Sequence, residues 1–438
     1  MAPPCSPDCR RRDVHWHLER AGDVRPTASS NESLMNIVLT AVIALRIVAS
    51  TATAQDAIMS RVSTRLSAMQ PELVAFRRDL HRHPEASGDE VRTAQRVAAR
   101  LRALGLEVRT GIGGHGVVGV LRGGKPGPVV AYRADMDAVR TNDPDPVAFR
   151  STTPGVRHIC GHDLHTTIGL ALASALHAVR QELPGTVVFI FQPAEERATG
   201  ANAMLAAGVL DNPTAVAIYG LHTAPLNVGQ LATISGDLMS GRDGFRIALS
   251  GRGDRAAAAR AISQILDSLG TIARTQSFAP APRDLIMLES SSDTNTGDAR
   301  VLFGTIMATS LSRPRVMTAM ADIRALAIPD VSVTVTYQPK VTAGVTNDAA
   351  LTQRAVDAVA GALGPGATIE MTQIIPAFSE DFGAFQDRVP GVFFFLGVSN
   401  PAKGTVGMPH TAEYVADERA IQIGARAMAA VILERLRR

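Results

Sequence analysis

Residues 129–137, VVAYRADMD, decide the class of fold that this sequence predicts. The stretch begins as an apolar run of strand length and ends in two aspartates, Asp135 and Asp137. In open parallel sheets ligands bind at the carboxyl ends of the strands, so a strand ending in acids suggests a site there. Two other apolar runs end similarly: 186–192 is followed by Glu195 and Glu196, and 215–221 is followed by His222.

Strand-like and helix-like segments alternate on both sides of this stretch. The helix-like segments carry apolar residues three and four positions apart. Strands that alternate with helices predict an α/β domain with a mostly parallel sheet. The expected strands are 117–121, 129–134, 186–192, 215–221 and 392–396, and the expected helices are 71–82, 89–104, 163–183, 348–362 and 417–436.

Residues 237–344 have a different pattern. Strand, helix, strand, helix and strand are expected at 245–250, 254–269, 301–305, 313–325 and 331–337. Glycine, serine, aspartate and asparagine around 290–298 predict a loop. We expect a smaller α+β lid domain here, inserted between two parts of a catalytic domain at 55–236 and 345–438. Residues suited to chemistry occur on both sides of the insertion.

The composition is that of a globular protein. The 438 residues are 46% hydrophobic and 19% charged, with a net charge of +3, and their number suffices for two domains. The basic residues form no run longer than three and are not interleaved with aromatic residues, which argues against a nucleic-acid partner.

Residues 1–54 are expected to be an N-terminal extension with a signal peptide. An apolar stretch within 35–54 is followed by small residues, which predicts cleavage after Ala54 and a periplasmic or secreted protein. The stretch is short for a membrane span. A cytoplasmic protein with an N-terminal extension is the alternative. Since Cys5 and Cys9 lie in this extension, Cys160 would be alone in the mature chain, with no internal disulfide.

The stretch HICGHDLHTT, residues 158–167, predicts a metal site. Cys160 and His162 lie two positions apart before an expected helix, and thiolate, imidazole and carboxylate are ligands of zinc, manganese or cobalt. Further ligand candidates stand at ends of other expected elements: Glu195, Glu196, His222 and His410.

The adjacent glutamates have separate expected roles. Neighbouring side chains at a strand end diverge, so Glu196 can bind metal while Glu195 faces the substrate as a general base. The alternative is a solvated acidic pair at the start of a helix.

Other polar residues are expected to be structural. They are His81 and His83 near a helix end, His158 beside the metal cluster, and 378–382, which could be an N-cap followed by first-turn acids.

Taken together, the motifs resemble the M20 metallopeptidases. The closest branch is that of N-acyl-amino-acid amidohydrolases, hippurate hydrolases and auxin-conjugate hydrolases, and the likeness covers about residues 60–438. The motifs, in order, are LHRHPE (80–85), YRADMDA (132–138), HICGHDLHTT (158–167), FQPAEE (191–196), LHTAP (221–225), FSEDFGAF (378–385) and MPHTAEY (408–414).

The resemblance implies a catalytic domain that holds two divalent metal ions, together with a lid domain that often forms homodimers. It implies hydrolysis of N-acyl amino acids, or of peptides as in dipeptidases and carboxypeptidases, by attack of metal-bound hydroxide. Asp137 would support the metal site, and Asp135 stands where related branches have a histidine ligand. The implied metal ligands are Cys160, His162, Glu196, His222 and His410, and the implied general base is Glu195.

The lid departs from the family pattern. Residues 250–256, SGRGDRA, lack the histidine of the usual Gly-Gly-His-Ala motif, and Met307 replaces the arginine of Gly-Thr-x-Arg. Loss of an oxyanion donor can lower the rate by orders of magnitude. Arg252 or Arg255 could replace the histidine. Alternatively, metal alone could stabilise the oxyanion on an easier substrate, or the chain could be a catalytically impaired metal-containing binding protein.

Overall fold

A computed structural model describes the backbone of residues 30–276, 279–376 and 378–438, with side chains from residue 56 onward. The chain divides into a unit up to Asp56 and a unit of Ala57–Arg438. The predicted leader lies outside the part whose side chains are described. Within the described residues, no helix has the length and apolar character needed to cross a membrane.

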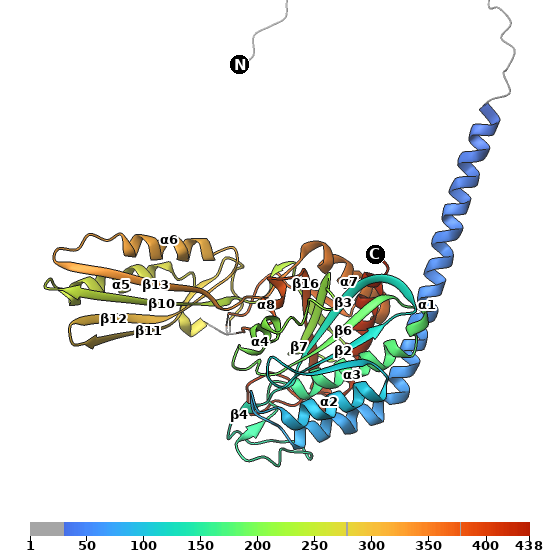
Figure 1. Cartoon of the computed structure of the whole chain (residues 1–438), viewed down its shortest axis with the longest axis horizontal. Helices are drawn as coiled ribbons and strands as arrows, with labels where there is room; N and C mark the ends of the chain where they lie inside the picture. The colour runs from blue at the N-terminus through green and yellow to red at the C-terminus, as the bar shows by residue number, and fades with distance from the viewer. Residues whose placement is uncertain (1–29, 277–278, 377) are drawn as a thin grey trace, which may run out of the picture. The chain divides into compact units, whose positions relative to one another are not determined.

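The larger sheet has eight strands in the order β1-β2-β6-β3-β7-β16-β8-β15 (Figure 1). The central neighbours β6, β3, β7 and β16 run parallel, whereas β1 and β2 are antiparallel additions at one side. The predicted α/β class with a mostly parallel sheet is therefore confirmed. The strands are β1 (Glu107–Ile112), β2 (Gly116–Arg122), β3 (Lys125–Asp135), β6 (Pro184–Gln192), β7 (Ala217–Asn227), β8 (Leu231–Thr233), β15 (Thr368–Glu370) and β16 (Gly391–Ser399).

Helices cover both faces of this sheet. In β6, Val187 and Phe189 belong to one apolar cluster, and Val188 and Ile190 belong to another on the opposite face. A parallel strand buried on both faces reads as a continuous apolar run, which is why the strand could be recognised in the sequence. The first cluster includes residues of α1 (Ser30–Arg82), α2 (Val91–Ala103), α3 (His162–His177), α7 (Ala349–Leu363) and α9 (Arg419–Leu436), and the second those of α4 (Gly200–Ala206) and α8 (Gly383–Gln386).

A second, antiparallel sheet has the order β11-β12-β10-β13 and packs against α5 and α6 (Figure 1). It lies in the chain between β9 (Gly236–Asp237) and β14 (Thr346–Asn347), which pair with each other. The chain therefore enters the smaller sheet after β9 and returns from it at β14, and these two strands lie side by side. The elements are β10 (Gly241–Gly251), α5 (Arg255–Leu269), β11 (Ile286–Thr296), β12 (Ala299–Ala308), α6 (Arg313–Arg324) and β13 (Val331–Thr342).

The loop predicted around 290–298 is wrong. Strand β11 continues to Thr296 and pairs with β12 as far as the Thr296–Ala299 pair, so only Gly297 and Asp298 form the turn. The polar residues mislead because β11 is an edge strand whose second half is exposed. Backbone hydrogen bonds form such a strand without apolar side chains, and strand propensity depends on this context.

Candidate metal centre

Three neighbouring strands of the larger sheet deliver polar side chains to one edge. Asp137 follows the end of β3, and Glu195 and Glu196 follow the end of β6. His222 lies within β7, which continues to Asn227 rather than ending at residue 221 as the sequence suggested. Cys160 precedes α3, whose first residue is His162.

Gly161 allows the turn between Cys160 and His162. Its φ of 93° lies in the left-handed region, which glycine adopts without strain. A Cβ at this position would overlap the hydroxyl of Tyr414 and lie 2.7 Å from Oγ1 of Thr223. A glycine is therefore required for the cysteine and the histidine to converge from this loop.

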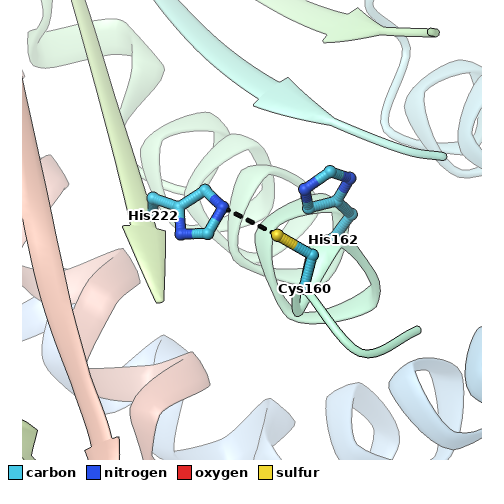
Figure 2. Close-up of side chains that lie close together, drawn as sticks. All are labelled: Cys160, His162 and His222. Carbon is cyan, nitrogen blue, oxygen red and sulfur yellow. Dashed lines mark hydrogen bonds between the residues drawn. The ribbon is translucent and has the colours of Figure 1, made fainter. Parts of the chain in front are cut away.

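The predicted ligand side chains lie together. Sγ of Cys160 is 3.1 Å from Nε2 of His222 and 3.2 Å from Nε2 of His410. Figure 2 shows Cys160, His162 and His222 close together, from the loop before α3, from α3 and from β7. Oε1 of Glu196 is 3.3 Å from Nε2 of His410 and 3.7 Å from Nε2 of His162. The group can therefore be divided into two sets that share the sulfur, Cys160–His162–His222 and Cys160–Glu196–His410.

Unsatisfied atoms in this group fit bound metal ions. Nε2 of His162 and Oε1 of Glu196 are buried and make no hydrogen bond within the described residues. A buried polar atom without a partner is costly, so such an atom calls for a ligand. The other ring nitrogens are occupied, because Nδ1 of His162 contacts Oδ1 of Asp137 at 3.1 Å and Nδ1 of His222 contacts the carbonyl of Thr223 at 2.7 Å. Such partners orient metal-binding imidazoles.

Asp137 supports two of the ligand candidates at once. Its Oδ1 contacts His162, and its Oδ2 accepts a hydrogen bond of 3.0 Å from the backbone N–H of Glu196. It is fully buried. A buried carboxylate with these two contacts holds the histidine ring and the glutamate backbone in register, so its position suits support of the ligands.

Both carboxylate oxygens of Asp135 have hydrogen-bonding partners. Nδ1 of His165 lies 2.6 Å from its Oδ1, and Nη1 of Arg133 donates to its Oδ2 at 2.6 Å. The backbone N–H of Thr223 donates to Nε2 of His165 at 2.9 Å, which assigns the ring proton to Nδ1. Asp135 therefore belongs to a buried network beneath the candidate ligands.

Glu195 lies beside two further buried acids, Glu380 and Asp381. Burial, together with the carboxylates of Glu380 and Glu196, raises the pKa of Glu195 well above its ordinary value. A glutamate that holds a proton this readily is suited to general acid–base chemistry. Burial also raises the pKa of the Cys160 thiol, so metal binding at the sulfur would release a proton.

The N-cap interpretation of 378–382 is wrong. Glu380 and Asp381 are buried, and their carboxylates accept hydrogen bonds from Nη2 of Arg133 at 2.8 and 3.2 Å. The next helix, α8, begins only at Gly383. The acids are therefore partners of a buried arginine. Sequence reasoning missed Arg133, although an arginine inside a buried apolar strand is itself a signal, because a buried charge requires partners.

Four of the five candidate ligands, all except the fully buried His162, line a cavity of about 390 Å³. Glu195, Glu380 and Asp381 also line it. Met239, Arg242 and Thr342, at or next to the ends of β10 and β13, contribute from the smaller sheet's side. Its volume is within the range of small-molecule sites.

The structure does not bring Arg252 or Arg255 to the cavity of the same chain. Arg242 lines the cavity near the start of β10, and Arg252 follows ten residues later, about 33 Å further along an extended strand. Arg255 donates to the backbone carbonyl of Asp298 at the hairpin turn. Neither arginine therefore lies where an oxyanion donor of its own chain would be needed.

Three further histidines, His81, His83 and His158, have structural surroundings. Nδ1 of His81 contacts Asp163 at 2.8 Å and its Nε2 contacts Asp145 at 3.1 Å, so His81 joins the buried start of α3 to the more exposed segment that contains Asp145. His83 is half exposed and caps the carbonyl of Asp79. His158 is buried, and neither of its ring nitrogens makes a hydrogen bond within the described residues.

Comparison with known proteins agrees, along most of the chain, with the family resemblance of the sequence motifs. The family model "Peptidase family M20/M25/M40" matches residues 131–434. IAA-amino acid hydrolase ILR1-like 4 of Arabidopsis thaliana is 32% identical over 81% of this chain and 83% of its own. Thermostable carboxypeptidase 2 of Saccharolobus solfataricus is 32% identical over 83% and 95%. The YXEP protein of Bacillus subtilis, described as a dinuclear metal binding peptidase from the M20 family, aligns with a TM-score of 0.71 and 31% identity over 85% and 99%.

Proposed function

We propose, from the premise that this chain belongs to peptidase family M20/M25/M40, that it hydrolyses the amide bond of N-acyl amino acids. Membership makes it a metal-dependent amide hydrolase. One observation carries the proposal: the buried Glu195 lies beside His162 and Glu196, whose Nε2 and Oε1 atoms make no hydrogen bond to any residue that the structure describes. The substrate class is supported by the Arabidopsis relative, whose name states an amino acid conjugate as its substrate.

Five side chains would hold two divalent ions. Bound divalent cations would lower the pKa of a water molecule and polarise the amide carbonyl. A cysteine ligand favours zinc, while the histidines and the carboxylate also suit manganese or cobalt. The proposed ligands are Cys160, His162, Glu196, His222 and His410.

Glu195 would move the proton. Its carboxylate accepts a proton from the attacking water as oxygen bonds to the amide carbon, and then donates that proton to the amide nitrogen as the C–N bond breaks. The products are a carboxylic acid and an amino acid. Burial and the neighbouring Glu380 raise the pKa of Glu195, which makes its carboxylate a stronger base in the first transfer. Asp137 would keep His162 oriented through both steps.

Peptide hydrolysis is the second candidate. It is supported by the relative named thermostable carboxypeptidase 2, which aligns over most of both chains. The two candidates share the metal centre and Glu195 and differ in the acyl group, which would be a simple acid in one and an amino acid residue in the other.

The test is amide hydrolysis by the full chain, loaded in turn with zinc, manganese and cobalt. The substrates are N-acetyl, N-benzoyl and longer N-acyl amino acids, with dipeptides as the second arm. Glu195→Gln should lower kcat by about 10²–10⁴-fold, the usual contribution of general acid–base catalysis, without loss of bound metal. Glu370→Gln, at an exposed glutamate of β15, is the matched control and should leave kcat unchanged.

Chelation should abolish turnover, and returning the metal should restore it. Bound metal without turnover of any substrate would contradict the proposal and favour a catalytically impaired binding protein.

We also propose export and a homodimer, on the apolar stretch within 35–54 and the family resemblance. A mature protein starting at Gln55, found by N-terminal sequencing, would support export. A sedimentation mass of one chain at micromolar concentration would contradict the dimer.

A further inference from the structure

One cation lines the cavity that the metal centre's carboxylates also line. Arg242, the second residue of β10, is the one arginine or lysine among the described residues that line the cavity. Arg133 lies nearby in the network but is fully buried and engaged by Asp135, Glu380 and Asp381. Arg242 is therefore the guanidinium in the described wall that a ligand in this cavity could reach.

Two elements hold the Arg242 guanidinium in place. Its Nε donates to both carboxylate oxygens of Glu289 at 2.9 and 3.0 Å, and its Nη1 donates to the hydroxyl of Ser379. Glu289 is in turn fixed by the hydroxyl of Thr305 at 2.9 Å. Nη2 makes no hydrogen bond within the residues that the structure describes, and 29% of the side chain is exposed. The group is thus oriented in advance and retains N–H donors for a ligand.

The position of Arg242 coincides with a departure from the family pattern. Arg242 lies directly opposite Met307 in the antiparallel pair of β10 and β12. Position 307 is where the resemblance leads one to expect an arginine, but Met307 is packed with Leu285 and Met287 in a small apolar cluster. Residues directly opposite each other share one face of a sheet. A guanidinium is therefore present at this level of the smaller sheet, supplied by the neighbouring strand.

We propose that Arg242 binds a carboxylate of the substrate and makes this enzyme selective for anionic amides; this rests on the proposed amide hydrolysis. A guanidinium pairs with a carboxylate through directed, charge-assisted hydrogen bonds. The substrate's amide would lie at Glu195 and the metal ligands, and its carboxylate would lie at the wall formed by Arg242.

The carboxylate could belong to either side of the amide. It would be the α-carboxylate of an N-acyl amino acid, or a carboxylate on the acyl chain of an N-acyl amine. Both give the same contact with Arg242, so the substrates must distinguish them.

The measurement is a selectivity ratio. kcat/KM is determined with zinc-loaded full chain for N-acetylmethionine and its amide, N-acetylmethioninamide, and for N-succinyl-benzylamine and its methyl ester. In at least one pair, the wild-type enzyme should have a higher kcat/KM for the carboxylate than for its neutral analogue. Arg242→Gln should lower that preference by about 10–100-fold, which corresponds to the loss of one hydrogen bond to a charged group. Arg242→Lys should restore part of it, and Arg246→Gln, an exposed arginine of β10, is the matched control.

Glu289→Gln provides a test of opposite sign. It keeps a side chain that can accept from Nε but removes the anion that competes with the substrate's carboxylate. The preference should therefore rise, whereas a purely structural ion pair would predict equal losses on charged and neutral substrates. The inference would be overturned if Arg242→Gln lowered kcat/KM equally for charged and neutral substrates, or if the wild-type enzyme had no preference for a carboxylate.

Binding separates this inference from the proposed function. Calorimetric titration of the same ligands into zinc-loaded Glu195→Gln, with and without Arg242→Gln, requires no turnover. If wild type hydrolyses none of the substrates but binds the carboxylates through Arg242, the function fails and the carboxylate site stands. If hydrolysis occurs but the Arg242 change lowers no affinity, the carboxylate site fails and the function stands.

Discussion

Replacing Arg133 by methionine should destabilise the protein and also alter the pH dependence of kcat/KM. Arg133 is fully buried and its guanidinium contacts Asp135 at 2.6 Å, Glu380 at 2.8 Å and Asp381 at 3.2 Å. Asp135 retains His165 when the arginine is removed, and burial raises the pKa of Asp381 to about 8, so that acid is largely neutral at pH 7. Glu380 is therefore the charge left without compensation.

The size of the effect follows from that single charge. Leaving one partner of a buried ion pair unpaired costs about 3–5 kcal/mol in the free energy of unfolding. For a unit of Ala57–Arg438 the unfolding entropy is about 0.8 kcal/mol per kelvin, so Tm should fall by about 4–6 °C. Adding Glu380→Gln removes the unpaired charge, so the double variant should be more stable than Arg133→Met alone.

The assay is thermal and urea unfolding of the zinc-loaded protein at pH 7 for wild type, both single variants and the double variant. A loss below about 1 kcal/mol for Arg133→Met, or a double variant whose two costs simply add, would refute the reasoning that Arg133 compensates Glu380.

The same variants should move the acid limb of the rate profile in opposite directions. Arg133 interacts with Glu195 as an opposite charge, and Glu380 raises the pKa of Glu195. Arg133→Met should shift the acid limb of kcat/KM to higher pH, and Glu380→Gln should shift it to lower pH. A shift of both variants in one direction would show that the limb does not report Glu195.

Two further outcomes are expected. Burial lowers the pKa of His158 to about 4 from an ordinary value of 6.5, so the unfolded chain binds the proton first as pH falls. Stability should therefore decline from about pH 6.5 towards pH 4, by about 2 kcal/mol between pH 7 and pH 5, and urea unfolding of His158→Phe should show that much less pH dependence. Arg252→Gln and Arg255→Gln should each change kcat/KM by less than about twofold, because both follow the end of β10 that is far from the cavity; a loss above tenfold in steady-state assays would show that a neighbouring subunit supplies them.

Much of the fold could be predicted because burial leaves a local trace. Strands β3 and β6 are apolar on both faces, so their runs were visible without any partner. Helix α9 carries its apolar residues at helical spacing over 18 residues, and its start differs by two residues from the prediction. The candidate metal residues were visible for a related reason, since Cys160, His162 and the Glu195–Glu196 pair each lie next to a recognisable element.

Other features depended on contacts between residues far apart in the chain. Arg133 and Glu380 are separated by 247 positions, and Arg242 and Ser379 by 137, so no periodicity near either member indicates its partner. The edge strand β11 was missed because backbone hydrogen bonds to β12 form it, and an exposed strand needs no apolar pattern. The sequence by itself therefore determined the α/β class and the candidate metal residues. The tertiary structure alone decided which charges compensate one another and which arginine lines the cavity, because electrostatic pairing depends on distance in space.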